Sequence, residues 1–233
     1  MSEWFSGNTI NGILNLWETP NNHSKCQQNP LNILNYHVQE WGTRALEVVE
    51  LMFNSDSSIG IFTEVGELWK DFTIPHFKSF YQKGTNSKGG VVVAVGKHLK
   101  ATHIDTNIEN TVIVDIEGLT EQIRIIGIYW PQSGDFNASA QEWQSPVTDA
   151  RCNQLKKWIE KNNSLFIPGT KNSSKRSERH IDLIFTNIED AEAETLNTGT
   201  SDHWPIVMKS DRIDFQTNGN FPAVSWIVSQ IVL

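Results

Sequence analysis

Apolar residues first follow a regular pattern between residues 31 and 64. Residues 31–38 alternate in the manner of a buried strand, and residues 42–53 place apolar side chains at the three-and-four spacing of an amphipathic helix. Residues 58–64 are apolar until they end on Glu64, which predicts a second strand. A strand, a helix and a strand of these lengths predict a right-handed crossover, in which the strand ends carry the chemistry.

From residue 77 onward the pattern changes to short β-branched runs separated by turn residues. These runs predict antiparallel strands at residues 77–82, 90–96, 100–105, 111–116 and 122–129. Pro131 ends the last of them, because proline has no N–H to donate to a sheet. Further along, the pattern predicts a helix at residues 149–162, strands at 165–168 and 180–186, and a last strand within 201–208.

The 233 residues fit one folded domain, which we place at residues 31–209. Residues 1–30 are rich in Asn, Gln and Ser and predict a polar N-terminal arm, and residues 210–233 predict a C-terminal tail. The elements alternate between helix-period and strand-period segments. The sequence therefore predicts an α/β (α+β) protein.

The net charge of −8 argues against a general nucleic-acid binder, because phosphate contacts need Lys and Arg. It is compatible with an enzyme that binds nucleic acid locally, through a basic loop and a metal. No apolar run reaches the roughly 18 residues that a bilayer requires, and the N-terminus lacks the pattern of a secretory signal. Cys26 and Cys152 form no metal-ligand spacing, so a reducing intracellular compartment is expected.

An acid and an amide stand two positions apart in the run Gly134-Asp135-Phe136-Asn137. On an extended strand both point to the same face, where they can hold a hydrated divalent cation and orient a phosphate oxygen. Asp and Asn also make turns, so the run acquires weight only from its context. That context is a set of polar residues at predicted strand ends, namely Asn35, Glu64, Tyr129, Asp182, Asp202 and His203.

Structural roles compete with functional ones at several of these positions. Glu64 fits a solvated strand-end glutamate, and Tyr129 fits the core. Asp182 interrupts an apolar run, where a carboxylate is costly to bury unless it is paired. The clearest basic cluster, residues 171–179, fits either a solvated loop or a loop that contacts phosphate through Lys171, Lys175, Arg176 and Arg179.

Taken together, the order and context of these residues resemble the endonuclease/exonuclease/phosphatase family, which includes DNase I-like nucleases and abasic-site endonucleases. After residue 133 the sequence looks like the endonuclease domain of non-LTR retrotransposons. The resemblance covers about residues 31–209. It rests on Gly-Asp-Phe-Asn-Ala, the run at 142–145, a capped helix ending at 158–160, Ile181-Asp182-Leu183 and Ser201-Asp202-His203-Trp204-Pro205.

The resemblance implies a two-sheet DNase I-like sandwich flanked by helices, and a role for each site residue. Glu64, with Asn35 nearby, would hold Mg²⁺, which Mn²⁺ can replace. Asp135 and Asn137 would position or deprotonate the attacking water and bind the scissile phosphate, and Tyr129 would donate to a phosphate oxygen. His203 would contact the phosphate, held in the right tautomer by Asp182. Asp202 would lie near the metal or the leaving group.

One departure from the family lies between Tyr129 and Gly134. The family separates the corresponding motifs by a helix and a fresh apolar strand, whereas here they are five positions apart. The resemblance therefore predicts that one helix and one core strand are missing. Such a loss would leave backbone groups on the neighbouring strands unpaired and an apolar face exposed.

Three functions are compatible with this sequence. The first is a Mg²⁺-dependent phosphodiester hydrolase that nicks DNA, a retrotransposon-type endonuclease domain acting inside the cell, with the nucleus as one compartment. The second is a catalytically silent remnant of such a domain. The third is a phosphoesterase of the same family that acts on a small molecule or lipid.

Overall fold

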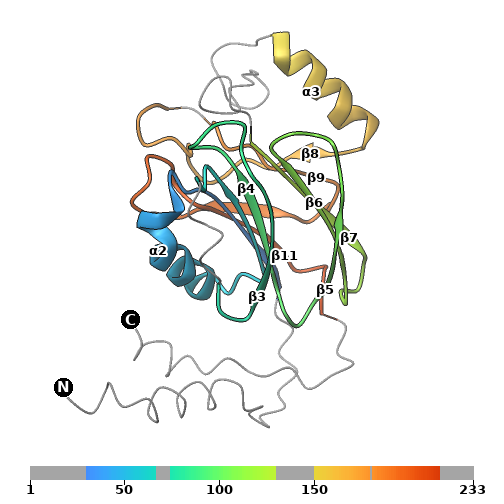
Figure 1. Cartoon of the computed structure of the whole chain (residues 1–233). Coiled ribbons are helices and arrows are strands. Elements are labelled where there is room, and N and C mark those ends of the chain that lie inside the picture. Colours follow the sequence, from blue (N-terminus) through green and yellow to red (C-terminus); the bar gives the residue numbers. More distant parts are fainter. Residues whose placement is uncertain (1–29, 67–73, 130–149, 179, 216–233) are drawn as a thin grey trace, which may run out of the picture. The chain divides into compact units, whose positions relative to one another are not determined.

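Two sheets face each other in the part of the chain that the structure describes, which comprises residues 30–66, 74–129, 150–178 and 180–215 (Figure 1). This computed structural model has six strands in the larger sheet, in the order β10-β11-β1-β2-β4-β3. A three-stranded sheet, β5-β6-β7, and a two-stranded sheet, β8-β9, complete the strands of these ranges. The two helices of the same ranges are α2 (Trp41–Asn54) and α3 (Ala150–Lys161).

The larger sheet is built around the predicted crossover. β1 (Leu31–His37) and β2 (Ile59–Thr63) pair in parallel and are joined through α2, which confirms the strand–helix–strand prediction. All other pairs in this sheet are antiparallel, and they involve β3 (Phe77–Gln82), β4 (Val91–Gly96), β10 (Glu192–Thr195) and β11 (Ile206–Ser210).

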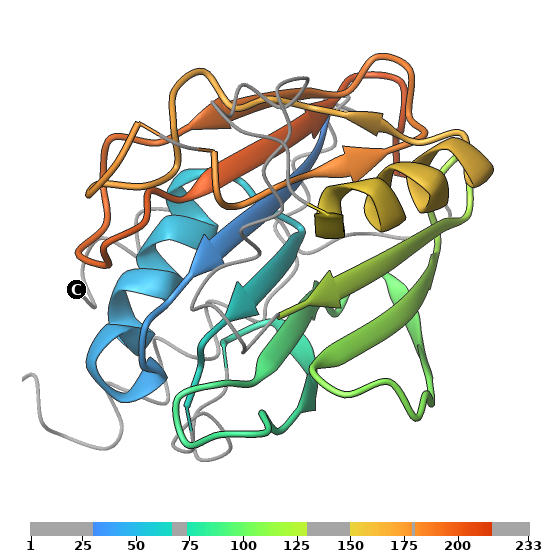
Figure 2. The same ribbon diagram turned by 90° about the horizontal axis from the view of Figure 1, so that it is seen from above.

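Alternation along β1 sends its side chains into two different cores. Leu34 and Tyr36 pack with α2 on one face of the sheet, whereas Leu31 and Ile33 pack towards the three-stranded sheet on the other. Figure 2 shows α2 on the side of the larger sheet away from the three-stranded sheet. Because Asn35 and His37 follow Ile33 at steps of two, they lie on the face that is covered by the second sheet.

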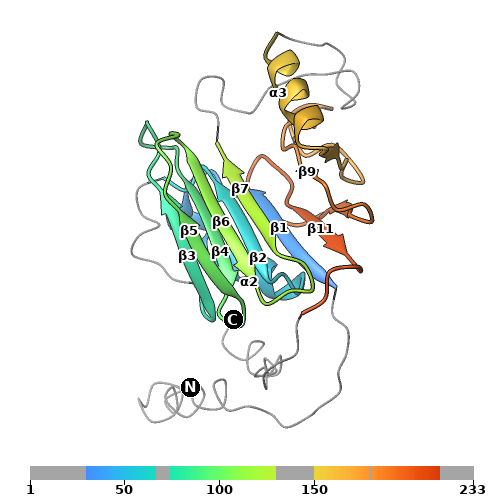
Figure 3. The same ribbon diagram turned by 90° about the vertical axis from the view of Figure 1, so that its right-hand side faces the viewer.

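The three-stranded sheet consists of β5 (Lys100–Ile104), β6 (Thr111–Glu117) and β7 (Ile123–Ile128), all antiparallel as predicted. Figure 3 shows it lying over β2, β3 and β4. The two layers come close at Gly127, where an added Cβ would meet Val91 at 3.0 Å and Ile61 at 3.1 Å. A side chain at this position would therefore push the sheets apart.

A smaller apolar cluster holds α3 against β8 (Leu165–Phe166) and β9 (Phe185–Thr186). It is formed by side chains from the helix, from both strands and from the segment before β9, namely Leu155, Ile159, Phe166, Leu183 and Phe185. The predicted helix at 149–162 is thus confirmed over the residues described, and α3 has its apolar face on this small sheet.

The second layer of the sandwich is divided. Within the described ranges β7 pairs only with β6, and β8 pairs only with β9. Ile128 at the end of β7 is 42% exposed, and Leu165 at the start of β8 is 58% exposed. The predicted loss of a helix and a strand concerns residues 130–149, which lie outside the described residues, so it stays a prediction.

Two strand predictions are wrong in part. Only Phe185–Thr186 of the predicted strand at 180–186 pairs with another strand, so Asp182 belongs to a loop. The backbone N–H groups of Ile181 and Asp182 instead donate to the hydroxyl of Ser173, at 3.1 and 3.0 Å. Likewise, only Leu165–Phe166 of the predicted strand at 165–168 is paired.

β10 was not predicted from the sequence. Its inward positions, Ala193 and Thr195, are small or polar, and its outward positions are the two glutamates. The alternation therefore lacks the large apolar residues that identify a strand. None of the helices in the described ranges has the length and apolar character needed to cross a bilayer.

Candidate active site

The carboxylate of Glu64 joins the ends of two strands. Its Oε1 accepts a hydrogen bond from the hydroxyl of Tyr129 at 2.7 Å, and its Oε2 lies 2.8 Å from Nε2 of His37. Glu64 follows β2, Tyr129 follows β7 and His37 ends β1, so the contact brings both layers of the sandwich together. The predicted strand-end residues Glu64 and Tyr129 are therefore neighbours in space.

Glu64 has a backbone conformation that is unusual for its residue type. Its φ is +52°, in the left-handed region that non-glycine residues seldom adopt. The backbone is held there by neighbours, since the carbonyl groups of Thr63 and Glu64 accept from Val38 and Glu40 at 2.9 and 2.7 Å. Strained conformations of this kind are concentrated at functional sites.

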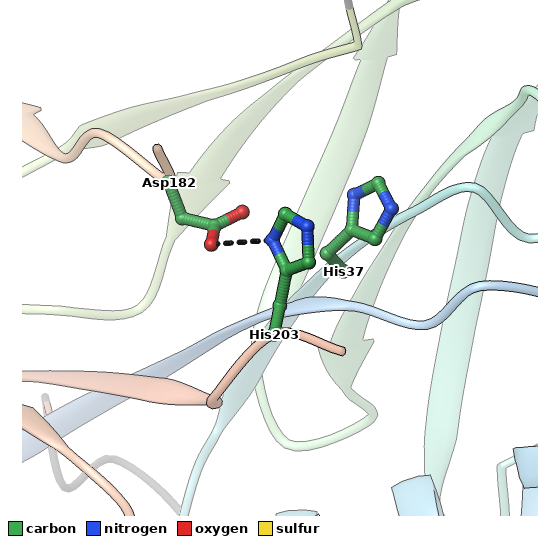
Figure 4. Close-up of side chains that lie close together, drawn as sticks. All are labelled: His37, Asp182 and His203. Carbon is green, nitrogen blue, oxygen red and sulfur yellow. Dashed lines mark hydrogen bonds and ion pairs between the residues drawn. The ribbon is translucent and has the colours of Figure 1, made fainter. Parts of the chain in front are cut away.

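His203 and Asp182 form the second pair of the site. Nδ1 of His203 lies 2.8 Å from Oδ2 of Asp182 (Figure 4), which is the contact expected from the sequence. Both side chains are largely shielded from solvent, with 5% and 13% of their surface exposed. Pairing with a histidine explains how a carboxylate is tolerated beside the apolar residues at 181 and 183–185.

The two pairs meet through their imidazole rings. The rings of His37 and His203 are stacked, with centroids 4.0 Å apart and an interplanar angle of 15°. Five segments of the chain are thus connected in one sequence of contacts. It runs from Tyr129 through Glu64, His37 and His203 to Asp182.

The same contacts set the ionisation of the two carboxyl groups. Burial acts to raise the pKa of Glu64, but the hydrogen bonds from His37 and Tyr129 and the charges of His37 and His203 bring it below its ordinary value. Burial also acts to raise the pKa of Asp182, and the hydrogen bond and charge of His203 outweigh it, so that this pKa is lowered as well. Both groups are therefore carboxylates at neutral pH.

Asp202 faces the site and the solvent. Its Oδ1 lies 3.9 Å from Nε2 of His203, and its Oδ2 lies 3.4 Å from the guanidinium of Arg176. The side chain of Arg176 is 76% exposed. It is therefore the cation of the described basic loop that is most accessible to a ligand near this carboxylate.

The two lysines of the basic loop have contacts within the protein. Their ammonium groups lie 3.8 and 3.9 Å from the ring centroid of Trp204, the residue after His203. Lys171 also donates to the side chain of Asn197, and Lys175 donates to the carbonyl of Gly199 at 2.6 Å. Burial lowers the pKa of Lys175. Contact of these two lysines with nucleic acid stays a prediction. Binding to phosphate would have to compete with their contacts to Trp204 and the neighbouring loop.

The loop that carries Asp202 and His203 is anchored on the opposite face of the larger sheet. The hydroxyl of Tyr36 donates to Glu47 at 2.5 Å and accepts from the backbone N–H of Ser201 at 3.0 Å. Glu47 accepts in turn from the backbone N–H and hydroxyl of Thr200, the latter at 2.6 Å. β1 and α2 therefore hold the histidine loop in place from behind.

A divalent cation has suitable ligands at one end of the site. The carboxylate of Glu64 and the amide oxygen of Asn35 are the hard oxygen donors that Mg²⁺ prefers. Asn35 is half-buried on the same face of β1 as His37. The carboxylate oxygens of Glu64 each accept one hydrogen bond and keep a further lone pair that a cation can use. The donor set of the predicted metal residues thus fits such an ion.

Three of the expected site residues, Asp135, Asn137 and Arg179, lie outside the described residues, so their predicted roles stay predictions. Sequence reasoning missed His37. The available signal was its position, two residues after Asn35 on the same face of a predicted strand that runs beside the strand ending at Glu64. A histidine on an apolar strand is more often part of the core, so the sequence alone does not single it out.

Comparison with known proteins identifies related sequences and folds. Residues 123–207 match a family described as "Endonuclease-reverse transcriptase", a span that includes Tyr129, Asp182, Asp202 and His203. No curated protein is significantly similar to the chain in sequence.

Among solved structures, the endonuclease domain of TRAS1, a telomere-specific non-LTR retrotransposon, aligns with a TM-score of 0.67 and 18% identity, over 81% of this chain and 100% of that one. The AP endonuclease LMAP from Leishmania major gives 0.61 and 9%, over 88% and 98%. The 3′ phosphatase NExo from Neisseria, bound to a product DNA hairpin, gives 0.56 and 13%, over 76% and 98%. At these identities the structures establish a shared α/β sandwich fold.

Proposed function

We propose that this chain is a member of the DNase I-like endonuclease/exonuclease/phosphatase family and a divalent-metal-dependent phosphodiester hydrolase that nicks DNA. Within that family we assign it to the type found as the endonuclease domain of non-LTR retrotransposons. The endonuclease description of the matched family and the nucleases and phosphatase among the similar structures support this choice.

The observation that carries the proposal is the unbroken contact between the two halves of the site. The Glu64 carboxylate, bound by His37 and Tyr129, lies at one end, and an imidazole bound to the Asp182 carboxylate lies at the other. The stacked histidines join them, with ring centroids 4.0 Å apart. Phosphodiester hydrolysis needs both kinds of group, one to hold a cation and one to donate to the non-bridging oxygens.

The reaction forms a bond between a water oxygen and phosphorus and breaks the bond from phosphorus to one deoxyribose oxygen. The attacking water gives up a proton to Asp135, and the leaving oxygen takes up a proton from solvent. We assign alignment of the water and part of the phosphate binding to Asp135 and Asn137. Tyr129 donates a hydrogen bond to a phosphate oxygen, and His203 acts as an imidazolium whose Nδ1–H is held by Asp182 and whose Nε2–H donates to the substrate. Asp202 lies near the leaving group or the metal.

Glu64 and Asn35 would hold Mg²⁺, or Mn²⁺ in its place. When bound, the ion neutralises the charge that develops on the phosphate and the leaving oxygen. The lowered pKa of Glu64 supports this assignment, because the group is available as a carboxylate at neutral pH.

Nicking of a supercoiled plasmid tests the proposal. We expect Mg²⁺-dependent conversion to the open circle, inhibition by EDTA, and a rate that falls on the order of a hundredfold or more in Asp135→Ala and His203→Ala. His103→Ala is the matched control, because His103 lies on β5 and pairs with Asp105 rather than with the site. Absence of nicking by folded protein at high concentration would reject the proposal.

A catalytically silent remnant is the second candidate, and the divided second layer supports it. Ile128 and Leu165 are exposed on two strands that have no partner beyond β6 and β9 within the described ranges. If Asp135 and Asn137 lack a strand to carry them, a displacement of about 1 Å costs on the order of a hundredfold in rate. Cleavage that disappears in Asp135→Ala would rule this candidate out. Turnover of a small phosphodiester without DNA nicking would favour a small-molecule phosphoesterase instead.

A further inference from the structure

His37 occupies the centre of the site without a role in the proposed reaction. Its side chain is 6% exposed, its Nε2 lies 2.8 Å from Glu64, and its ring is stacked on His203. Nδ1 lies 3.2 Å from the hydroxyl of Thr63, the residue opposite it in the parallel pair. Every polar atom of this imidazole therefore has a partner.

One role for His37 would be to bind a metal jointly with its neighbours. Donor atoms of His37, Asp182 and His203 all lie within 4.8 Å of one another. However, the lone pair of an imidazole nitrogen lies in the ring plane, and the two rings are nearly parallel. An ion at a bonding distance of about 2.0–2.1 Å from both nitrogens would lie far out of at least one plane. The stacked arrangement (Figure 4) is thus unsuited to shared coordination.

The hydrogen bonds instead define the proton positions on both rings. A carboxylate only accepts, so Nε2 of His37 donates to Glu64, and its Nδ1 can accept from Thr63. By the same argument Nδ1 of His203 donates to Asp182, and its Nε2 points towards Asp202. These hydrogen bonds fix the planes of both rings, which stack with centroids 4.0 Å apart.

We propose that His37 is a positioning residue that acts on both halves of the site. Its ring fixes the plane of the His203 imidazole by stacking, and its Nε2–H fixes the Glu64 carboxylate for the cation. The expected effects on nicking rest on the proposed function. The orientation of His203 and Glu64 by His37 can be tested whether or not the protein cleaves DNA. The ring face of His37 acts on His203, and its Nε2–H acts on Glu64. Two substitutions can therefore separate the two effects.

His37→Phe keeps a ring against His203 and removes the donor to Glu64. His37→Gln keeps an amide donor within reach of Glu64 and removes the ring. His103→Phe and His103→Gln are matched controls, because His103 also lies against an aromatic ring, that of Phe80, away from the site. Folding of all four variants is checked by urea denaturation.

Two measurements separate the effects. For the ring, histidine-selective NMR reports the ring-current shift of the carbon-bound protons of His203, which we expect to persist in His37→Phe and to be lost in His37→Gln. For the donor, titration calorimetry with Mg²⁺ reports the dissociation constant, which we expect to rise about 10–100-fold in His37→Phe and to change little in His37→Gln. In the nicking assay, His37→Gln then lowers kcat, and His37→Phe raises the Mg²⁺ concentration required.

Equal His203 shifts in wild type and His37→Gln, or equal Mg²⁺ affinity in wild type and His37→Phe, would overturn the inference. Tight Zn²⁺ binding that requires both histidines would also overturn it, in favour of shared coordination. If wild type does not nick DNA, the proposed function fails, but the NMR shifts still decide whether His37 orients His203.

Discussion

The hydroxyl of Tyr36 accepts a hydrogen bond from the backbone N–H of Ser201 at 3.0 Å, across 165 positions of sequence. Tyr36 is 1% exposed and lies on the face of β1 opposite to His37. A single strand therefore contributes a stacking partner to His203 on one face and a support for the loop of His203 on the other.

We expect Tyr36→Phe to destabilise the protein and to weaken catalysis. The substitution keeps the ring but leaves the N–H of Ser201 and part of the Glu47 carboxylate without this partner, which costs about 1–3 kcal/mol in the free energy of unfolding. Urea denaturation measures the loss, and nicking assays show whether kcat falls. Tyr81→Phe, at a side chain that is 48% exposed, should leave both quantities unchanged.

Glu47→Gln tests whether the two side chains act as a unit. Because Glu47 binds both Tyr36 and Thr200, a double-mutant cycle with Tyr36→Phe should give a coupling free energy of about 0.5–3 kcal/mol. Simple additivity of the two effects would show that the supports of the histidine loop are independent.

Asp182→Asn should reduce nicking by about 10²–10⁴-fold while the protein remains folded. The amide has the shape of the carboxylate but not its charge, so His203 loses the group that holds its proton on Nδ1. Initial rates and a pH profile measure the effect. Asp115→Asn is the control, because Asp115 pairs with Arg124 at 2.6 Å on the surface of the three-stranded sheet. Equal rates in wild type and Asp182→Asn would contradict the assigned role.

Stability should decrease in acid because of the same carboxylates. The pKa values of Glu64 and Asp182 lie below their ordinary values of 4.5 and 3.8, so the unfolded chain takes up protons at a higher pH than the folded protein. Their contribution is complete above the ordinary values and is lost as pH falls below them. Urea denaturation between about pH 7 and pH 3 measures this dependence. It should be flatter in a Glu64→Gln, Asp182→Asn double variant, and identical slopes would refute the prediction.

The basic loop should divide into two functions. Arg176→Ala is expected to lower the salt dependence of DNA binding by about one unit of slope, since this side chain is exposed beside Asp202. Lys171→Ala and Lys175→Ala are expected to cost about 0.5–1 kcal/mol of stability each, through loss of their contacts with Trp204. Fluorescence anisotropy at several salt concentrations and urea denaturation distinguish the two outcomes. A lysine variant that changes only the salt slope would contradict this division.

Much of the fold could be predicted because period and residue type agree over long stretches. β1, α2 and β2 have clear apolar periods, and the valines of β4 and β6 favour strands on both local and packing grounds. β10 and the loop around Asp182 were mispredicted for opposite reasons. The first has little apolar content, and the second has an apolar run whose backbone donors are taken by Ser173.

The site was predictable in its residue types but not in its connections. Glu64, Tyr129, Asp182 and His203 have strand-end positions and polar character that sequence reasoning can recognise. The contact that joins them runs through His37, and stacking of this strand residue on His203 of a distant loop depends on the tertiary structure, which no local pattern encodes. The packing of Lys171 and Lys175 on Trp204 was missed for the same reason.

The division of the second layer has a consequence for protein engineering. Within the described residues, His37, Glu64 and the His203 loop are held by the larger sheet, and Tyr129 reaches them from the end of the three-stranded one. The three-stranded sheet can therefore accept a transplanted segment beside β7. Grafting a helix and strand between residues 130 and 133 would add a partner for β7 without altering the register of any strand that positions the histidines. Comparing the nicking rate before and after the graft would measure how much that one strand contributes to catalysis.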